Sequence, residues 1–112
     1  MLLSVSEFYS FIQNTEKTSH IKMRNYRFKH LNLNARPIDG FIAIIDKHPI
    51  NGVEVHALYS DGSIRIYNYR TKKLITVLIA RPGQAKRLNP EIQLPEEIYN
   101  ICYRNMKMKY NH

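Results

Sequence analysis

Near the start of the chain, apolar residues recur with the spacing of an α-helix. Val5, Phe8, Tyr9 and Ile12 follow this helical spacing. Ser4 and Glu7 have the spacing of a capping box, in which each side chain accepts a hydrogen bond from the other residue's backbone N–H. This pattern predicts a first helix over roughly residues 4–14.

The following segment, SHIKMRNYRFKHLNLN, has a mixed pattern. Ser19 can cap a helix over residues 20–31. The end of the segment, HLNLNA, instead alternates between polar and apolar residues, which is typical of a strand. We favour the helix, and Pro37 would end either element.

The middle of the chain shows the alternation of β-strands. Four segments carry this pattern, namely residues 41–46, 53–59, 63–69 and 74–80. Asp61 and Gly62 form a strong two-residue hairpin signal between the second and third segments. Arg70 and Thr71 can form the next tight turn. Four consecutive strands with short turns predict an antiparallel meander.

A last helix is predicted over residues 95–108, because Pro95 opens it and acidic residues occupy its first turn. We expect a broad packing face on it, made of Ile98, Tyr99, Ile101, Cys102, Tyr103 and Met106. The chain is therefore predicted to form a single α+β domain over residues 1–112. Its four-stranded antiparallel meander would have the N-terminal helices and the C-terminal helix packed on one face.

The charge of the chain is unbalanced. Lys and Arg number 17 against nine Asp and Glu, which gives a formal net charge of +8. Two blocks without any acidic residue, 17–36 and 62–90, hold six and seven of these cations. A solvated surface usually mixes both signs, so this asymmetry predicts an anionic partner, either nucleic acid or a membrane surface.

The remaining composition narrows the class of protein. Cys102 is the only cysteine and is expected to be a small buried residue. The first residues carry no cationic leader, and Glu7 interrupts them, unlike a signal peptide. No apolar run approaches the ~20 residues that a membrane span needs. We therefore expect a cytoplasmic protein with no membrane partner.

The predicted turn at Asp61 and Gly62 would fix which side chains share a face of the sheet. In that register His56 lies opposite Tyr67. The polar face would then carry Glu54, His56, Arg65, Tyr67, Tyr69 and Thr76. Cross-strand neighbours lie ~5 Å apart, so one phosphate could contact several of these side chains at once.

These residue types suit the cleavage of RNA by its own 2′-OH, which requires no metal and no cofactor. Histidine can move the proton, and arginine and hydroxyl groups can hold the phosphate. The candidate catalytic residues are His20, His56, Arg65, Tyr67 and Thr76. The candidate RNA- or phosphate-binding residues are Arg24, Lys29, His30, Arg81, Gln84, Lys86 and Arg87.

Structural interpretations of the same residues stay open. His56, Arg65, Tyr67 and Thr76 are also common on the exposed side of a strand. Residues 81–84 fit a type II turn as well as a phosphate-binding loop.

Over residues 18–85 the chain resembles the barnase–EndoU–colicin–RelE superfamily of small ribonuclease toxins. The superfamily's helix with a histidine and spaced arginines is similar to HIKMRNYRF, matching at His20 and Arg24. Its central hairpin and last strand are similar to HALYSDGSIRIYNYRTKKLITVLIARPGQ. The resemblance implies a metal-independent endoribonuclease toxin that cleaves tRNA or mRNA with His20, Arg65 and Thr76, and a cognate antitoxin or immunity protein.

The predicted helix over 95–108 extends beyond the last strand of that superfamily. That helix could replace a packing element or bind an antitoxin. An alternative to the toxin is a non-catalytic RNA- or DNA-binding regulatory protein of phage or plasmid origin that uses the same basic sheet. A third class is an interaction protein whose basic face docks an acidic partner.

Overall fold

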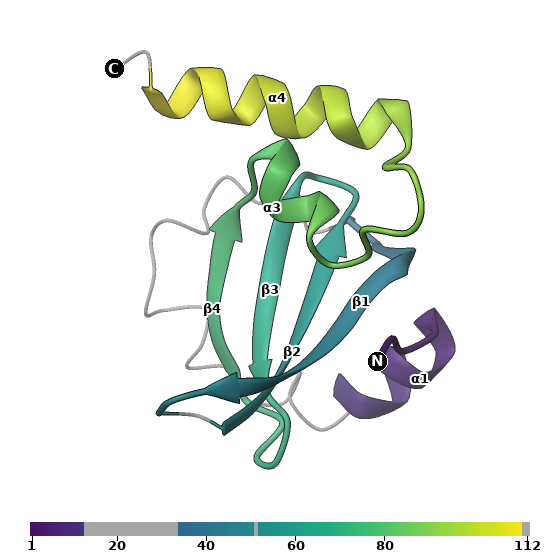
Figure 1. Cartoon of the computed structure of the whole chain (residues 1–112), viewed down its shortest axis with the longest axis vertical. Coiled ribbons are helices and arrows are strands. Elements are labelled where there is room, and N and C mark those ends of the chain that lie inside the picture. The colour runs from purple at the N-terminus through teal and green to yellow at the C-terminus, as the bar shows by residue number, and fades with distance from the viewer. Residues whose placement is uncertain (13–33, 51, 111–112) are drawn as a thin grey trace.

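The computed structural model describes residues 1–12, 34–50 and 52–110. Four strands form one antiparallel sheet in the order β1-β2-β3-β4 (Figure 1). The strands are β1 (Pro37–His48), β2 (Gly52–Tyr59), β3 (Ser63–Asn68) and β4 (Leu74–Ile79). The helices are α1 (Val5–Ile12), α3 (Pro82–Lys86) and α4 (Glu96–Tyr110). These elements confirm the predicted α+β fold, and the helix predicted over 20–31 lies outside the described residues.

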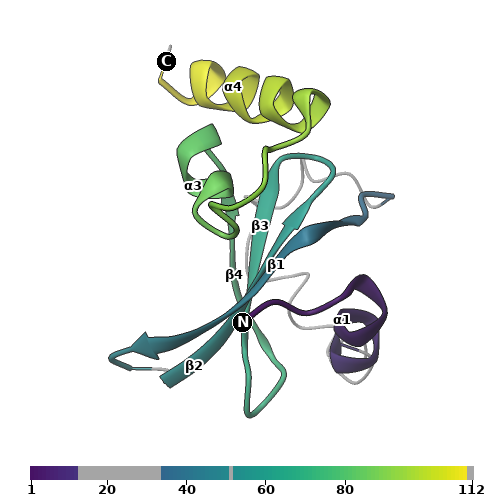
Figure 2. The same ribbon diagram turned by 45° about the vertical axis from the view of Figure 1, so that its right-hand side comes forward.

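The helices divide between the two faces of the sheet, although the sequence led us to expect them on one face. Figure 2 shows α1 on one side of the sheet and α3 on the other. The α1-side core consists of Phe8, Ile12, Ile42, Val55, Ala57, Tyr59 and Tyr67. The α4-side core consists of Phe41, Ala43, Leu58, Ile64, Ile66, Ala80, Ala85, Leu88, Leu94, Ile98 and Cys102. Both faces of the sheet are apolar, so each needs its own helical cover.

The capping box at the start of α1 is confirmed. The Ser4 N–H donates to Glu7 Oε1 at 2.8 Å, and the Glu7 N–H donates to Ser4 Oγ at 3.0 Å. Hydrogen bonds from the Ser4 N–H and from the Ser4 side chain lower the pKa of the Glu7 carboxyl, because they favour its charged form. The sequence therefore predicted the start of this helix, and of the four residues with helical spacing Phe8 and Ile12 are buried, whereas Tyr9 is exposed.

The turn between β2 and β3 differs from the prediction by one residue. Leu58 pairs with Ile64, and Ala57 pairs with Arg65, so the loop has three residues rather than two. The Gly62 N–H donates to the Tyr59 carbonyl at 2.9 Å, and Gly62 has a φ of +81°. A type I turn followed by a left-handed glycine is the common form of a three-residue hairpin loop.

The hairpin between β3 and β4 has an irregular register. Tyr67 pairs with Leu74 as predicted, but Ile66 pairs with Thr76, which leaves Ile75 as an extra residue in β4. The loop after β3 is held by the Asn68 side chain, whose Oδ1 accepts from the N–H groups of residues 70 and 71 at 2.9 Å. Such a bulge moves Thr76 to the other face from Tyr67.

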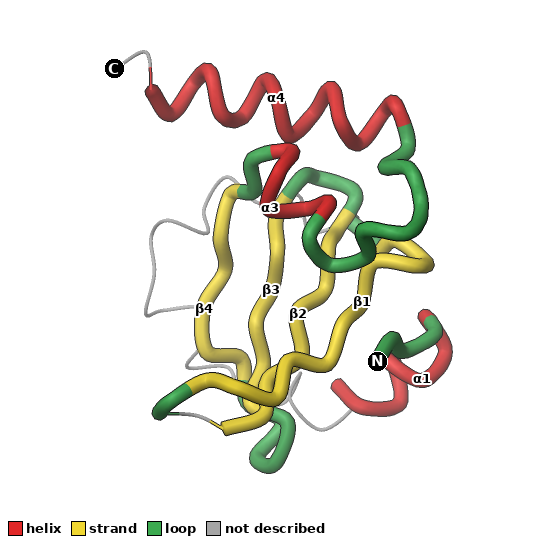
Figure 3. The backbone as a smooth tube through the Cα atoms, viewed as in Figure 1, coloured by secondary structure: helices red, strands yellow, loops and turns green. Residues whose placement is uncertain are grey.

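Helix α4 lies across the end of the sheet at the β2–β3 turn (Figure 3). A Cβ added at Gly62 would lie 2.9 Å from Ile101 Cγ2 and 2.6 Å from Asn105 Nδ2. The Asn105 side chain also donates to the Asp61 carbonyl at 3.2 Å. The turn and the helix are thus in close contact, and glycine is needed at this position for two reasons, the positive φ and the lack of space.

The segment between α3 and α4 is anchored to β1. The buried Asn89 donates from Nδ2 to the Gly40 carbonyl at 2.9 Å. Together with the turn contact, this bond fixes α3 and α4 relative to each other and to the sheet.

In the part of the chain that the structure describes, no helix has the length and apolar character needed to cross a membrane.

Candidate nucleic-acid interface

The observed register separates the predicted catalytic residues. His56 lies opposite Ile66 and therefore faces α3 and α4, whereas Arg65 lies opposite Ala57 and faces α1. A shift of one residue in a strand pair turns every side chain to the other face. The predicted group of His56, Arg65, Tyr67 and Thr76 on one face is therefore wrong.

Arg65 and Tyr67 have packing roles on the α1 side. The Arg65 guanidinium lies 3.7 Å from the centre of the Tyr59 ring, and its buried Nε has no hydrogen-bond partner among the described residues. Tyr67 is 5 % exposed and packs edge-on against Phe8 with ring centres 5.5 Å apart. Burial raises the pKa of the Tyr59 hydroxyl, as expected inside an aromatic core.

His56 and Thr76 do share the α4-side face, but two strands apart. Both lie opposite Ile66, from β2 and β4 respectively, which places their Cα atoms about 10 Å apart. His56 Nε2 is hydrogen-bonded to Glu54 Oε1 at 2.9 Å, and Glu54 is buried. The structure thus brings together a histidine and a carboxylate, without an arginine from β3.

Four other predicted residues, His20, Arg24, Lys29 and His30, lie outside the described residues. The structure places Arg81, Gln84, Lys86 and Arg87 in and beside α3. Of the two interpretations left open for residues 81–84, the type II turn is wrong, because the Ala85 N–H donates to the Arg81 carbonyl at 3.1 Å as in a helix. The Gln84 side chain caps this helix by accepting from the Arg81 N–H at 2.9 Å. These bonds position three exposed cations, Arg81, Lys86 and Arg87, along one short element.

An open groove runs between α3 and α4 and consists of two adjoining hollows. The first, of about 460 Å³, is lined by Pro82, Gly83, Lys86, Gln93, Leu94, Glu96 and Tyr99. The second, of about 400 Å³, shares Pro82, Gly83 and Tyr99 with the first and adds Arg81, Gln84, Arg87, Tyr103 and Met106. None of the described residues that line the second hollow is acidic. We call these two hollows the α3/α4 groove.

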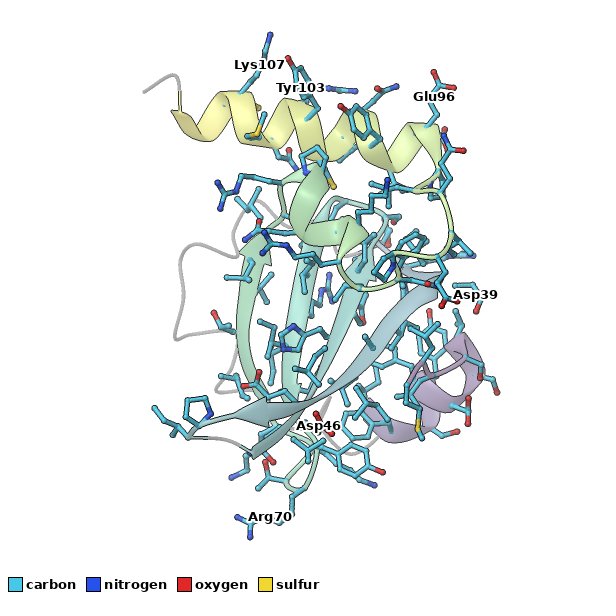
Figure 4. All side chains as sticks on the ribbon, viewed as in Figure 1. Asp39, Asp46, Arg70, Glu96, Tyr103 and Lys107 are labelled. Atoms are coloured by element: carbon cyan, nitrogen blue, oxygen red, sulfur yellow. The ribbon has the colours of Figure 1, made fainter. Side chains whose placement is uncertain are left out.

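Tyr99 and Tyr103 form a row on the exposed side of α4 next to this groove. Their rings are within 10° of parallel, with centres 6.2 Å apart, and the side chains are 45 % and 41 % exposed. Lys107 continues the row, with Nζ 5.2 Å from the Tyr103 ring centre. Figure 4 shows Tyr103 and Lys107 pointing away from the sheet. We call these three residues the α4 row.

The sequence interpretation missed the two tyrosines of the α4 row by assigning them to the packing face of the last helix. In the structure Ile98 and Cys102 provide the buried side of α4. Tyr99, Tyr103 and Lys107 are spaced by four residues, so they form a single stripe on the helix. That spacing was the available signal, since it separates the three from the buried pair.

Comparisons with protein-family models, with curated proteins and with solved structures find no match to this chain.

Proposed function

We propose that this protein binds RNA through the phosphate backbone, with the α3/α4 groove and the α4 row as the contact surface. The observation that carries the proposal is the second hollow. Arg81 and Arg87 line it together with two exposed tyrosines, and no acidic residue described there opposes them. Arginine forms paired hydrogen bonds with phosphate, and aromatic rings accept bases.

Among the residues that the structure describes, the geometry supports binding better than cleavage. In the cleaving site predicted on the sheet, a histidine and a phosphate-holding arginine would contact the same phosphate group, so both would lie on one face. His56 and Arg65 lie on opposite faces of the sheet, so they do not meet this requirement. A binding surface needs cations and exposed rings on one open face, and the α3/α4 groove supplies both. The alternative inferred from the sequence, a non-catalytic RNA-binding protein, is therefore better supported than the nuclease.

The binding energy should depend strongly on salt, because each cation that contacts a phosphate releases a counterion. Arg81, Lys86, Arg87 and Lys107 provide four such cations around the groove. For a single strand this number corresponds to a slope of about −3 in a plot of log affinity against log salt.

The test is fluorescence anisotropy with a labelled RNA at several salt concentrations. We expect the double variant Arg81→Gln/Arg87→Gln to bind more weakly and to reduce the steepness of the slope by about 1 to 1.5. The matched control is Arg70→Gln/Lys73→Gln, which removes the same charge from the loop after β3. Figure 4 shows Arg70 at the end of the molecule far from Lys107. If both variants weakened binding equally, the effect would come from the loss of net charge alone, and the assigned surface would be contradicted.

RNA cleavage is a second candidate function, favoured by the hydrogen bond between His56 and Glu54. A carboxylate that holds a histidine in one orientation is a common arrangement for a general base. We expect any such activity to persist in EDTA, to yield 2′,3′-cyclic phosphate ends and to be lost in His56→Ala. Activity that survives His56→Ala would exclude this pair as the proton-transferring groups. Inactivity of the unmodified protein on total RNA would leave binding as the function.

A further inference from the structure

We infer that the α3/α4 groove selects single-stranded nucleic acid, with unpaired bases stacked on Tyr99 and Tyr103. This inference rests on the proposed function and adds the class of ligand. The same surface could bind a duplex by charge alone, so the inference depends on the tyrosines rather than on the cations.

The tyrosine rings have the geometry of a stacking platform. The two rings are within 10° of parallel, and more than two-fifths of each side chain is exposed. Ile98 and Cys102 on the same helix are buried, so the tyrosines are not on its packing side. A pair of rings four residues apart also stabilises a helix slightly, which is the structural explanation to be tested. That explanation does not account for the arginines that line the hollow beside the same rings.

Cations from both α3 and α4 lie next to the rings, within reach of a nucleic acid backbone. Arg81 and Arg87 come from α3, and Lys107 comes from the next turn of α4 beyond Tyr103. A strand with a base on a tyrosine ring could place its phosphates against the cations of either helix. In a duplex the bases are already stacked and paired, so their faces are not accessible to these rings.

Gly83 provides space next to the rings. It lines both hollows beside Tyr99, and a Cβ added there would meet no described atom within 4 Å. A side chain at this position would therefore occupy the groove without a clash in the protein. This makes Gly83 a position at which the groove can be blocked while the fold is preserved.

The first experiment compares the affinity for a single-stranded oligonucleotide with that for a duplex of the same length, in RNA and DNA versions. We expect Tyr99→Leu/Tyr103→Leu to lose at least about tenfold in affinity for the single strand, with little change for the duplex. The RNA and DNA versions identify which sugar the site accepts, and a preference for either single strand supports the inference. An equal loss for single strand and duplex, or no loss, would overturn the stacking role.

The second experiment blocks the groove. Gly83→Glu should weaken single-strand binding by at least about tenfold, whereas the control Thr71→Glu, which adds the same charge at an exposed position in the loop after β3, should bind normally, and thermal unfolding of both variants reports on the fold. Normal binding by a folded Gly83→Glu variant would contradict the inference. The two proposals can fail separately. If the protein binds no nucleic acid at low salt, the proposed function is rejected. If it binds in a salt-dependent way without preferring single strands, only the inference is rejected.

Discussion

Two groups of aromatic rings in this molecule have opposite surroundings. On the α1 side, Phe8 is fully buried and meets Tyr59 and Tyr67 at 74° and 72° between ring planes. On α4, Tyr99 and Tyr103 are exposed and lie at 10° to each other. Edge-on contacts fill a core in three dimensions. Tyr99 and Tyr103 instead remain accessible from the solvent.

The difference shows that residue type alone does not separate packing from binding. Tyr59, Tyr99 and Tyr103 each lie near an arginine, but Arg65 covers the Tyr59 ring within the protein, whereas Arg81 and Arg87 line an open groove beside the other two rings. The accessible arginines and rings are therefore the ones available to a ligand. We expect the two aromatic groups to differ in energy and reactivity as they differ in exposure.

The largest expected difference is in stability. Phe8→Ala should lower the free energy of unfolding by about 3–5 kcal/mol, because it removes a fully buried ring from the α1-side core. Tyr103→Ala, at an exposed position, should change it by no more than about 0.5 kcal/mol. Urea unfolding followed by circular dichroism measures both. Similar losses in the two variants would mean that the α4 row has a packing role.

A smaller effect is expected where α4 meets the sheet. Gly62→Ala should destabilise the protein by more than about 1 kcal/mol, because alanine is strained at this positive φ and its Cβ would collide with Asn105 or Ile101. Gly83→Ala is the matched control, since the added methyl group has open space there. An equally stable Gly62→Ala variant in urea unfolding would show that α4 is not held against the β2–β3 turn as described.

The third expectation concerns Cys102, on the buried side of α4. Burial, with a smaller effect of Asp61, raises the pKa of its thiol to about 11. In the unfolded chain the thiol ionises at its ordinary pKa of 9.0, so its contribution to stability is present below pH 9 and is lost as the pH rises toward 11. At pH 8 we expect iodoacetamide to label the folded protein much more slowly than the unfolded one. Equal labelling rates would contradict the burial of this side of α4.

The sequence was sufficient for most of the fold, because alternation and capping are local. The register between β2 and β3 was not predictable in the same way, since Asp61 and Gly62 fit both a two-residue and a three-residue loop. The longer loop is consistent with two further contacts: Asp61 Oδ1 accepts from the Ser63 N–H at 3.0 Å, and Gly62 packs against α4. One of these contacts is tertiary, which local sequence patterns do not report.

The candidate site was predicted only in part. Arg81, Lys86 and Arg87 were identified because an acid-free run of cations indicates an exposed surface. Tyr99 and Tyr103 were missed because the last helix has two overlapping stripes of apolar residues. The contact of α4 with the end of the sheet decides which stripe is buried, and that contact depends on the whole fold.

Photo-crosslinking of a 4-thiouridine RNA, followed by mass spectrometry of the modified peptides, tests the central claim most directly. The chain has eight tyrosines, so the reaction compares the two aromatic groups within one sample. We predict crosslinks at Tyr99 or Tyr103 that disappear in Gly83→Glu and persist in Thr71→Glu. Crosslinks at Tyr59 or Tyr67, or crosslinks confined to residues outside α3 and α4, would contradict the assignment of the RNA-binding surface to the α3/α4 groove.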